Sequence, residues 1–135
     1  MKSLVCYLTE SMEKIPNAFV ILKPEFLEHE LEWKNMIQSN GWMILDTKKK
    51  QLTLDEAKDL YSPHKGKDFY KDLCKYMSSD KCLCMACYKK SDDPIKDMDK
   101  LKDKVREKWG KDDMKNAMHS SDSLENVKRE SKIIF

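Results

Sequence analysis

Glycine is scarce in this sequence, with three residues among 135, and the signatures GxGxxG and GxxxxGK[ST] are both missing. Any phosphate chemistry therefore cannot be of the Rossmann or P-loop type. No run of roughly 18 apolar residues occurs, so we expect no membrane-spanning helix and no membrane partner. The 26 basic and 24 acidic residues leave a net charge of +2, so bulk charge gives no reason to expect nucleic-acid binding.

The cysteines do not favour a disulfide framework. Their number, five, is odd, and three of them lie between residues 82 and 87, in a segment typical of a buried strand. Cys84 and Cys87 have the CxxC spacing of a zinc site, but no second CxxC or nearby histidine pair completes four ligands. On a strand the two side chains would also face opposite sides. We therefore expect buried apolar thiols and no metal site.

The length fits one domain with a substantial core. We expect residues 1–17 to form an N-terminal extension and residues 18–135 to form the domain. The first residues make a poor signal peptide because Glu10 and Glu13 follow them closely, so a cytoplasmic location is the default.

Hydrophobic periodicity and turn residues predict an alternation of strands and helices. The order suggests a ferredoxin-like βαββαβ sandwich of the α+β class, with a four-stranded antiparallel sheet and helices on one face. The predicted strands are 18–22, 42–47, 82–88 and 133–135. The predicted helices are 25–39, 54–61 with a Thr53/Glu56 capping box, 68–79, 94–109, and one ending near 129 with an Asp122/Glu125 capping box.

His119 is the first candidate for chemistry. It precedes a cluster of hydroxyls and a carboxylate that is typical of a helix N-terminus, where unpaired N–H groups favour an anion such as phosphate. A histidine there could act as a nucleophile. The same segment also fits an ordinary surface or core histidine before a capped helix.

Other candidates lie along the chain before His119. Lys23 ends the first buried strand, where it is either a solvated residue or a cation aimed into a cleft. Tyr61 and Phe69 bracket a polar loop, and an aromatic ring at the lip of such a loop can stack on a nucleobase.

The order of these motifs resembles that of nucleoside diphosphate kinases. The resemblance extends from about residue 18 to the C-terminus. Its first motif resembles the family's strand ending in Lys-Pro-Asp, and its main motif resembles the family's Asn-x-x-His-Gly-Ser-Asp-Ser. The matching segments are AFVILKPE at 18–25, Tyr61, Phe69, KYMSS at 75–79, Arg106, NAMHSSDS at 116–123 and ESKIIF at 130–135.

The resemblance implies a ping-pong transfer of the γ-phosphate of a nucleoside triphosphate such as ATP to a nucleoside diphosphate, through a phosphohistidine at His119. Glu130 would hold the histidine tautomer, and Ser121 would support Glu130 and the loop. Lys23 and Arg106 would neutralise the transferring phosphoryl group.

For the nucleotide itself, the resemblance implies that Tyr61 steadies the phosphate end and Phe69 stacks on the base. Asn116, together with Lys23, would hold the ribose hydroxyl. Mg²⁺ would arrive on the nucleotide phosphates, so no protein metal ligands are implied. The expected partners are nucleoside di- and triphosphates and further copies of the chain in a homo-oligomer.

The sequence also departs from the family pattern. Ser120 replaces the glycine after the histidine, and Asp80-Lys81 replaces a Gly-Pro pair. The segment between Tyr88 and Arg106 is short, and the family's second phosphate arginine and a nearby threonine have no match.

Lys96, Lys100 or Lys102 could replace the arginine, although lysine lacks its bidentate fork. Two alternatives therefore stay open beside an active kinase: a catalytically weak or inactive nucleotide-binding relative, and, on the lysine runs alone, a nucleic-acid-binding module.

Overall fold

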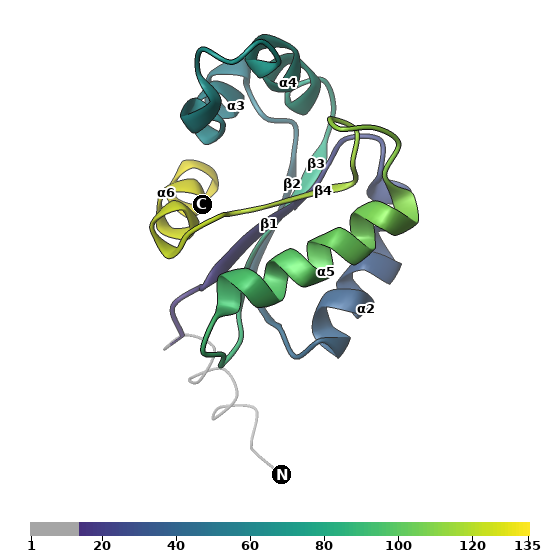
Figure 1. Cartoon of the computed structure of the whole chain (residues 1–135), viewed down its shortest axis with the longest axis vertical. Coiled ribbons are helices and arrows are strands. Elements are labelled where there is room, and N and C mark those ends of the chain that lie inside the picture. The colour runs from purple at the N-terminus through teal and green to yellow at the C-terminus, as the bar shows by residue number, and fades with distance from the viewer. Residues whose placement is uncertain (1–13) are drawn as a thin grey trace.

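The computed structural model describes residues 14–135, so most of the predicted extension lies outside the described residues. Figure 1 shows the strands in the middle of the molecule with helices on either side. In chain order the elements are β1 (Ala18–Leu22), the 3₁₀ helix η1 (Leu27–His29), α2 (Glu30–Ser39), β2 (Met43–Lys50), α3 (Leu54–Leu60), the 3₁₀ helix η2 (Ser62–His64), α4 (Tyr70–Met77), β3 (Cys82–Tyr88), α5 (Pro94–Trp109), β4 (Met118–Ser120) and α6 (Leu124–Ile134).

The four strands form one antiparallel sheet in the order β2-β3-β1-β4. The two central strands, β1 and β3, are buried along nearly their whole length. This explains their continuous apolar runs, because a strand covered on both faces has no solvated side. The topology is the predicted ferredoxin-like α+β sandwich.

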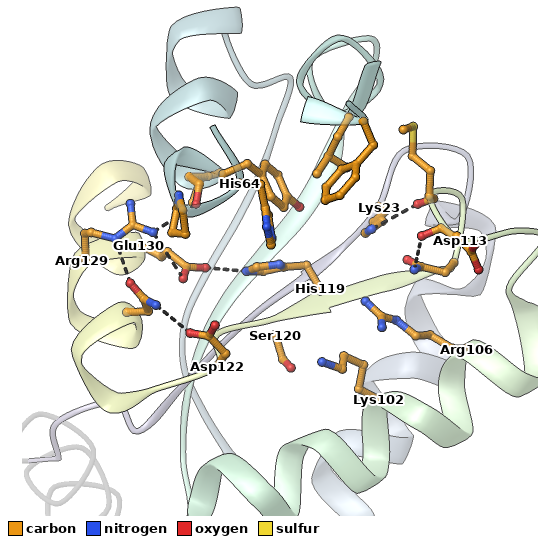
Figure 2. A pocket seen from close by; sticks show the side chains of 18 residues that line it. Lys23, His64, Lys102, Arg106, Asp113, His119, Ser120, Asp122, Arg129 and Glu130 are labelled. Carbon is orange, nitrogen blue, oxygen red and sulfur yellow. Dashed lines mark hydrogen bonds and ion pairs between the residues drawn. The ribbon is translucent and has the colours of Figure 1, made fainter. Parts of the chain in front are cut away.

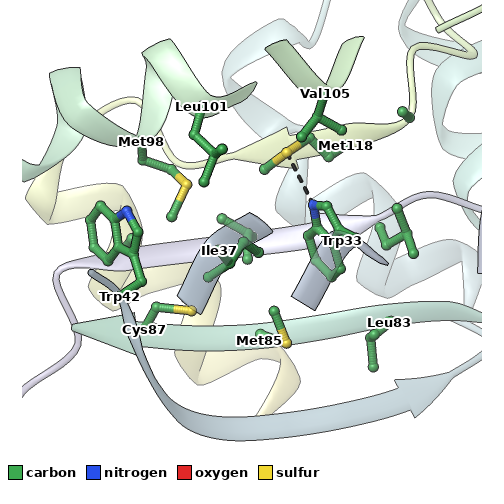
Figure 3. Close-up of a cluster of buried hydrophobic side chains, with 14 of the residues drawn as sticks. Trp33, Ile37, Trp42, Leu83, Met85, Cys87, Met98, Leu101, Val105 and Met118 are labelled. Carbon is green, nitrogen blue, oxygen red and sulfur yellow. Dashed lines mark hydrogen bonds between the residues drawn. The ribbon is translucent and has the colours of Figure 1, made fainter. Parts of the chain in front are cut away.

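Helices cover both faces of the sheet, so the expectation of helices on one face was wrong. Side chains alternate along β1: Val20 and Leu22 pack toward α2 and α5, whereas Phe19 and Ile21 pack toward α3, α4 and α6. Figure 3 shows the first of these clusters, in which the Trp33 indole lies against the sheet and contacts the sulfur of Met118. Because β1 is apolar on both sides, each side needs its own cover.

The cysteines of β3 behave as the alternation predicts. Cys84 and Cys87 belong to the clusters on opposite faces of the sheet, and both are fully buried. Burial raises the pKa of Cys87 to about 12. These thiols pack as small apolar side chains.

Two helix starts agree with their sequence signals. The Thr53 hydroxyl accepts a hydrogen bond from the Glu56 N–H, and the Glu56 carboxylate accepts one from the Thr53 N–H, so the predicted capping box is confirmed. Asp93 caps α5 by accepting from the Lys96 N–H, with Pro94 as the first helical residue.

The boundaries of three other elements differ from the prediction. The helix predicted at 25–39 is divided into η1 and α2, and the one predicted at 68–79 is the shorter α4. β2 extends through the lysines at 48–50, where Lys49 pairs with Glu30 at 2.6 Å and Lys50 with Glu56 at 2.7 Å. These ion pairs give the lysines partners on the helices beside the strand.

The C-terminus is helical, so the strand predicted at 133–135 was wrong. The isoleucines there continue α6, because Val127, Glu130 and Ile134 share the buried side of that helix. The fourth strand is instead β4, with His119 paired to Ile21. The predicted Asp122/Glu125 capping box was also wrong.

Ser123 is the N-cap of α6. Its hydroxyl accepts a hydrogen bond from the N–H of Asn126 at 3.1 Å. The Asp122 carboxylate accepts from the side-chain amide of the same asparagine.

Candidate active site

His119 occupies the middle of β4 and contacts α6 through its ring. Its Nε2 lies 2.5 Å from Oε1 of Glu130, a carboxylate that is 3% exposed. A carboxylate accepts, so this contact assigns the proton of a neutral imidazole to Nε2. Nδ1 then carries the lone pair, and it has no hydrogen-bond partner among residues 14–135. The geometry leaves one ring nitrogen available as a nucleophile.

Arg129 fixes the helix that carries Glu130, and nothing in the sequence singled it out. Its guanidinium donates to the carbonyls of Asp59 at 2.7 Å and Leu60 at 3.1 Å, at the end of α3. It also lies 3.8 Å from the second carboxylate oxygen of Glu130. Arg129 thereby satisfies unpaired helix-end carbonyls and ties α6 to α3.

Two of the predicted cations line the same pocket as His119. Lys23 is 4% exposed, and its Nζ donates to the Met114 carbonyl at 3.1 Å. Burial, reinforced by the charges of Arg106 and Lys102, lowers the pKa of Lys23 from 10.5 to about 7. Arg106, on α5, donates from Nε and Nη2 to the Met118 carbonyl at 3.2 and 3.1 Å. Both cations are thus held by the strand that bears the histidine and the loop before it.

The loop between α5 and β4 is tightly placed. A Cβ at Gly110 would lie 2.4 Å from the carbonyl oxygen of Arg106, so only glycine fits there. Ala117 has a φ of 78°, an unfavourable conformation for a residue with a Cβ. The Ala117 carbonyl accepts from the Lys23 N–H at 2.8 Å, which joins this strained turn to the end of β1. Such strain two residues before His119 is typical of a functional site.

Aromatic rings form the opposite wall. Tyr61 is buried, and its ring meets the His119 ring edge-on at 5.4 Å between centroids. Burial and then the Glu130 charge raise the pKa of Tyr61 well above 10, so its hydroxyl stays a donor. His64 lies between Tyr61 and Phe69, with centroid distances of 6.3 and 5.3 Å. Phe69 is 43% exposed at the lip.

Several buried polar atoms in or near this site lack partners within the described part of the chain. They include the Tyr61 hydroxyl and Oδ1 of Asn116. The other side-chain atom of Asn116 is used, since its Nδ2 donates to the Asp113 carbonyl at 2.8 Å. Buried polar atoms left unpaired are costly, so these atoms are suited to meeting a polar ligand.

These side chains surround a pocket of about 600 Å³. Figure 2 shows side chains converging on the cavity around His119 from α5, α6 and the α3–α4 region. The pocket brings together seven of the eight predicted site residues: Lys23, Tyr61, Phe69, Arg106, Asn116, His119 and Glu130. Among the three candidate replacement lysines, Lys102 lines the pocket, whereas Lys96 and Lys100 do not.

Ser121 is the predicted site residue that does not join the others. It is buried, its N–H donates to the Phe19 carbonyl at 3.0 Å, and its hydroxyl has no partner among residues 14–135. The Ser121 side chain therefore makes no hydrogen bond to Glu130, the residue that it was expected to support. The neighbouring Ser120, which ends β4, lines the pocket instead. It does not have a positive φ, so a side chain is accommodated there without backbone strain.

Two further properties concern metals and membranes. Within residues 14–135, no group of three or more histidine, cysteine, aspartate or glutamate side chains could hold a metal ion. In the same part of the chain, no helix has the length and apolar character needed to cross a membrane.

The chain is similar to known proteins over most of its length. The family model for nucleoside diphosphate kinase matches residues 16–135. The chain belongs to the nucleoside diphosphate kinase family. The nucleoside diphosphate kinase of Kosmotoga olearia is 33% identical over 130 residues, which cover 87% of this chain and 86% of that protein.

Another relative is a much longer protein than this chain. Thioredoxin domain-containing protein 6 of Xenopus laevis is 30% identical over 133 residues, or 90% of this chain, but the match covers only 21% of that relative. Among solved structures, the Aquifex aeolicus nucleoside diphosphate kinase has a TM-score of 0.77 at 26% identity, over 87% of this chain and 93% of that one.

Proposed function

We propose that this family member is an active nucleoside diphosphate kinase that works through a phosphohistidine at His119. The observation that carries the proposal is the orientation of the ring. Nε2 is held by the buried Glu130 carboxylate, and Nδ1 has no partner among the described residues in the pocket that Lys23 and Arg106 also line. A neutral imidazole with a fixed tautomer is a competent nucleophile for phosphorus.

In the first half-reaction, the Nδ1 lone pair attacks the γ-phosphorus of a nucleoside triphosphate. The bond to the bridging oxygen breaks, its electron pair stays on that oxygen, and the nucleoside diphosphate leaves. In the second half-reaction, a terminal phosphate oxygen of another diphosphate attacks the same phosphorus. The P–N bond then breaks and returns its electron pair to Nδ1, so the enzyme is regenerated. The Nε2 proton remains on the ring throughout, next to Glu130.

The cations and Tyr61 provide electrostatic stabilisation. Phosphoryl transfer has a loose transition state, so positioning and charge supply most of the catalysis. Arg106 uses Nε and Nη2 on the Met118 carbonyl, which leaves Nη1 for a phosphate oxygen. A bound phosphate favours the protonated, positively charged form of Lys23. The Tyr61 hydroxyl, which has no partner among the described residues, can donate a hydrogen bond to the same phosphate.

The nucleoside would occupy the outer part of the pocket. Phe69, exposed at the lip, offers its ring to a base, and stacking of this kind tolerates purines and pyrimidines alike. Asn116 and Lys23 would hold a ribose hydroxyl, a role supported by the unpaired Oδ1 of Asn116. Mg²⁺ would enter on the nucleotide phosphates and neutralise part of their charge.

Exchange of phosphate between a triphosphate and a diphosphate with different bases tests the proposal. We expect turnover by the wild type and its loss in His119→Ala. His29→Ala is the matched control, since His29 stacks on Trp109 with centroids 4.4 Å apart and does not line the pocket. Exchange that survives in His119→Ala at the wild-type rate would contradict the mechanism.

A nucleotide-binding relative with weak or no catalysis is the second candidate. It is favoured by Ser120, which lines the pocket, and by the missing match to the family's second phosphate arginine. This protein would bind nucleoside diphosphates but form no phosphohistidine. The homo-oligomer and the cytoplasmic location stay predictions, and sedimentation of the purified chain would measure the first.

A further inference from the structure

Lys102 lines the pocket, and it is linked to Ser120 through Asp99. Its side chain is 17% exposed, and its Nζ lies 3.2 Å from Oδ1 of Asp99. The same oxygen accepts a hydrogen bond from the Ser120 hydroxyl at 3.4 Å. One carboxylate oxygen thus joins a cation on α5 to the residue that directly follows His119 on β4. The serine that departs from the family pattern and a candidate replacement for the missing arginine therefore contact the same carboxylate oxygen.

Lys102 and Arg106 lie one turn apart on α5 and therefore share a side of that helix. Figure 2 shows both side chains extending toward the cavity near His119 and Ser120. The charge of Lys102 reaches Lys23, because it contributes to lowering the pKa of that residue. Lys23, Lys102 and Arg106 therefore act on one region of the pocket.

The cations of this region have few close counter-ions. Among the described residues, the Asp99–Lys102 contact is the one ion pair within 4 Å that involves any of these three cations. Asp99 is itself 45% exposed, so water weakens its hold on the ammonium. Glu130, the nearest buried carboxylate, is already engaged by His119. Asp112 acts on Lys23, and Asp103 and Asp99 act on Arg106, through charge without an ion pair within 4 Å. These cations can therefore bind a ligand that carries several negative charges.

We propose that Lys102, held toward the pocket by Asp99 and Ser120, binds a phosphate oxygen of the nucleotide and is the third phosphate-binding cation of this chain. This inference rests on the proposed function, since it assigns a residue to the same nucleotide. A lysine on α5 would thus compensate for the absent arginine. Its ammonium makes a point contact, whereas a guanidinium would bind in a bidentate manner.

Titration calorimetry with a nucleoside diphosphate and the corresponding uncharged nucleoside tests this role, and no turnover occurs without a triphosphate. We expect Lys102→Met to weaken diphosphate binding about tenfold or more, the loss typical of one charged hydrogen bond. Nucleoside binding should not change. Lys102→Arg should keep diphosphate affinity at or above the wild-type value. Lys100→Met, on the exposed side of α5, is the matched control and should bind both ligands like the wild type.

Equal diphosphate affinity in Lys102→Met and Lys100→Met would overturn the inference. A parallel loss of diphosphate and nucleoside affinity in Lys102→Met would also overturn it, because that pattern indicates a packing role. The result is separable from the proposed function. If the wild type exchanges phosphate and Lys102→Met binds the diphosphate normally, the inference about Lys102 is wrong and the proposed kinase function stands. If the wild type forms no phosphohistidine and Lys102→Met still loses diphosphate affinity, the proposed kinase function is wrong and the inference about Lys102 stands.

Discussion

The buried charge of Lys23 in the pocket should lower the free energy of unfolding of the protein. The Lys23 ammonium is 4% exposed, is bonded to one carbonyl and faces two other cations. The pKa falls from 10.5 to about 7, and each unit corresponds to about 1.4 kcal/mol. Carrying the charge therefore costs the folded state about 4–5 kcal/mol below pH 7. Replacement by methionine removes this cost but leaves the Met114 carbonyl unpaired, which costs about 1–3 kcal/mol at every pH.

The pH dependence isolates the charge from the lost hydrogen bond. Between pH 7 and pH 10 the unfolded wild type keeps the Lys23 proton while the folded state has lost it, so wild-type stability rises with pH. The stability advantage of Lys23→Met should thus shrink by about 3 kcal/mol from pH 7 to pH 10 and stay constant below pH 7.

Urea unfolding of both proteins across this range measures the difference, with Lys100→Met as a control whose difference from wild type should not vary. A Lys23→Met advantage that is equal at pH 7 and pH 10 would refute the account of Lys23.

Three further changes probe other parts of the molecule. Glu130→Gln should lower kcat/KM by at least about 10²-fold, since an amide can donate to Nε2 and move the ring proton to Nδ1; a wild-type rate of single-turnover phosphorylation would argue against tautomer control. Phe69→Ala should raise the KM of purine and pyrimidine nucleotides about tenfold through lost stacking, with an unchanged thermal midpoint; a KM unaffected for both classes would exclude base stacking. Thr53→Ala should lower the free energy of unfolding by about 1 kcal/mol because it breaks the capping box of α3; equal urea midpoints would show that the cap contributes nothing.

The central part of the fold could be predicted because its signals are local and strong. β1 and β3 are uninterrupted apolar runs, and a strand buried on both faces leaves few other arrangements for such a run. α5 begins at a capped proline and keeps its apolar period over 16 residues, so its bounds agreed with the prediction. Ferredoxin-like topology then followed from the order of the elements.

The C-terminal region could not be assigned from local pattern. β4 has three residues, two of them polar, and is a strand because it pairs with the edge of β1. Two isoleucines and a phenylalanine at 133–135 have high strand propensity, but α6 places Ile134 against the sheet with Val127. In both cases tertiary contacts decided the conformation.

The chemistry of the site was easier to predict than its supports. His119, Glu130 and Lys23 belong to motifs that match a family, and the pocket brings them together. Arg129 and Ser120 act through backbone carbonyls and a distant aspartate, which no sequence spacing indicates. Roles of that kind depend on how α5 and α6 pack on the sheet.

The central claim, phosphate transfer through Nδ1 of His119, can be tested by intact mass and ³¹P NMR after incubation with ATP and Mg²⁺. We predict one phosphoryl group per chain, labile in acid, located on Nδ1 and discharged by a nucleoside diphosphate. The same treatment of His119→Ala should leave the mass unchanged. A wild type without the adduct, or an adduct that persists in His119→Ala, would contradict the claim.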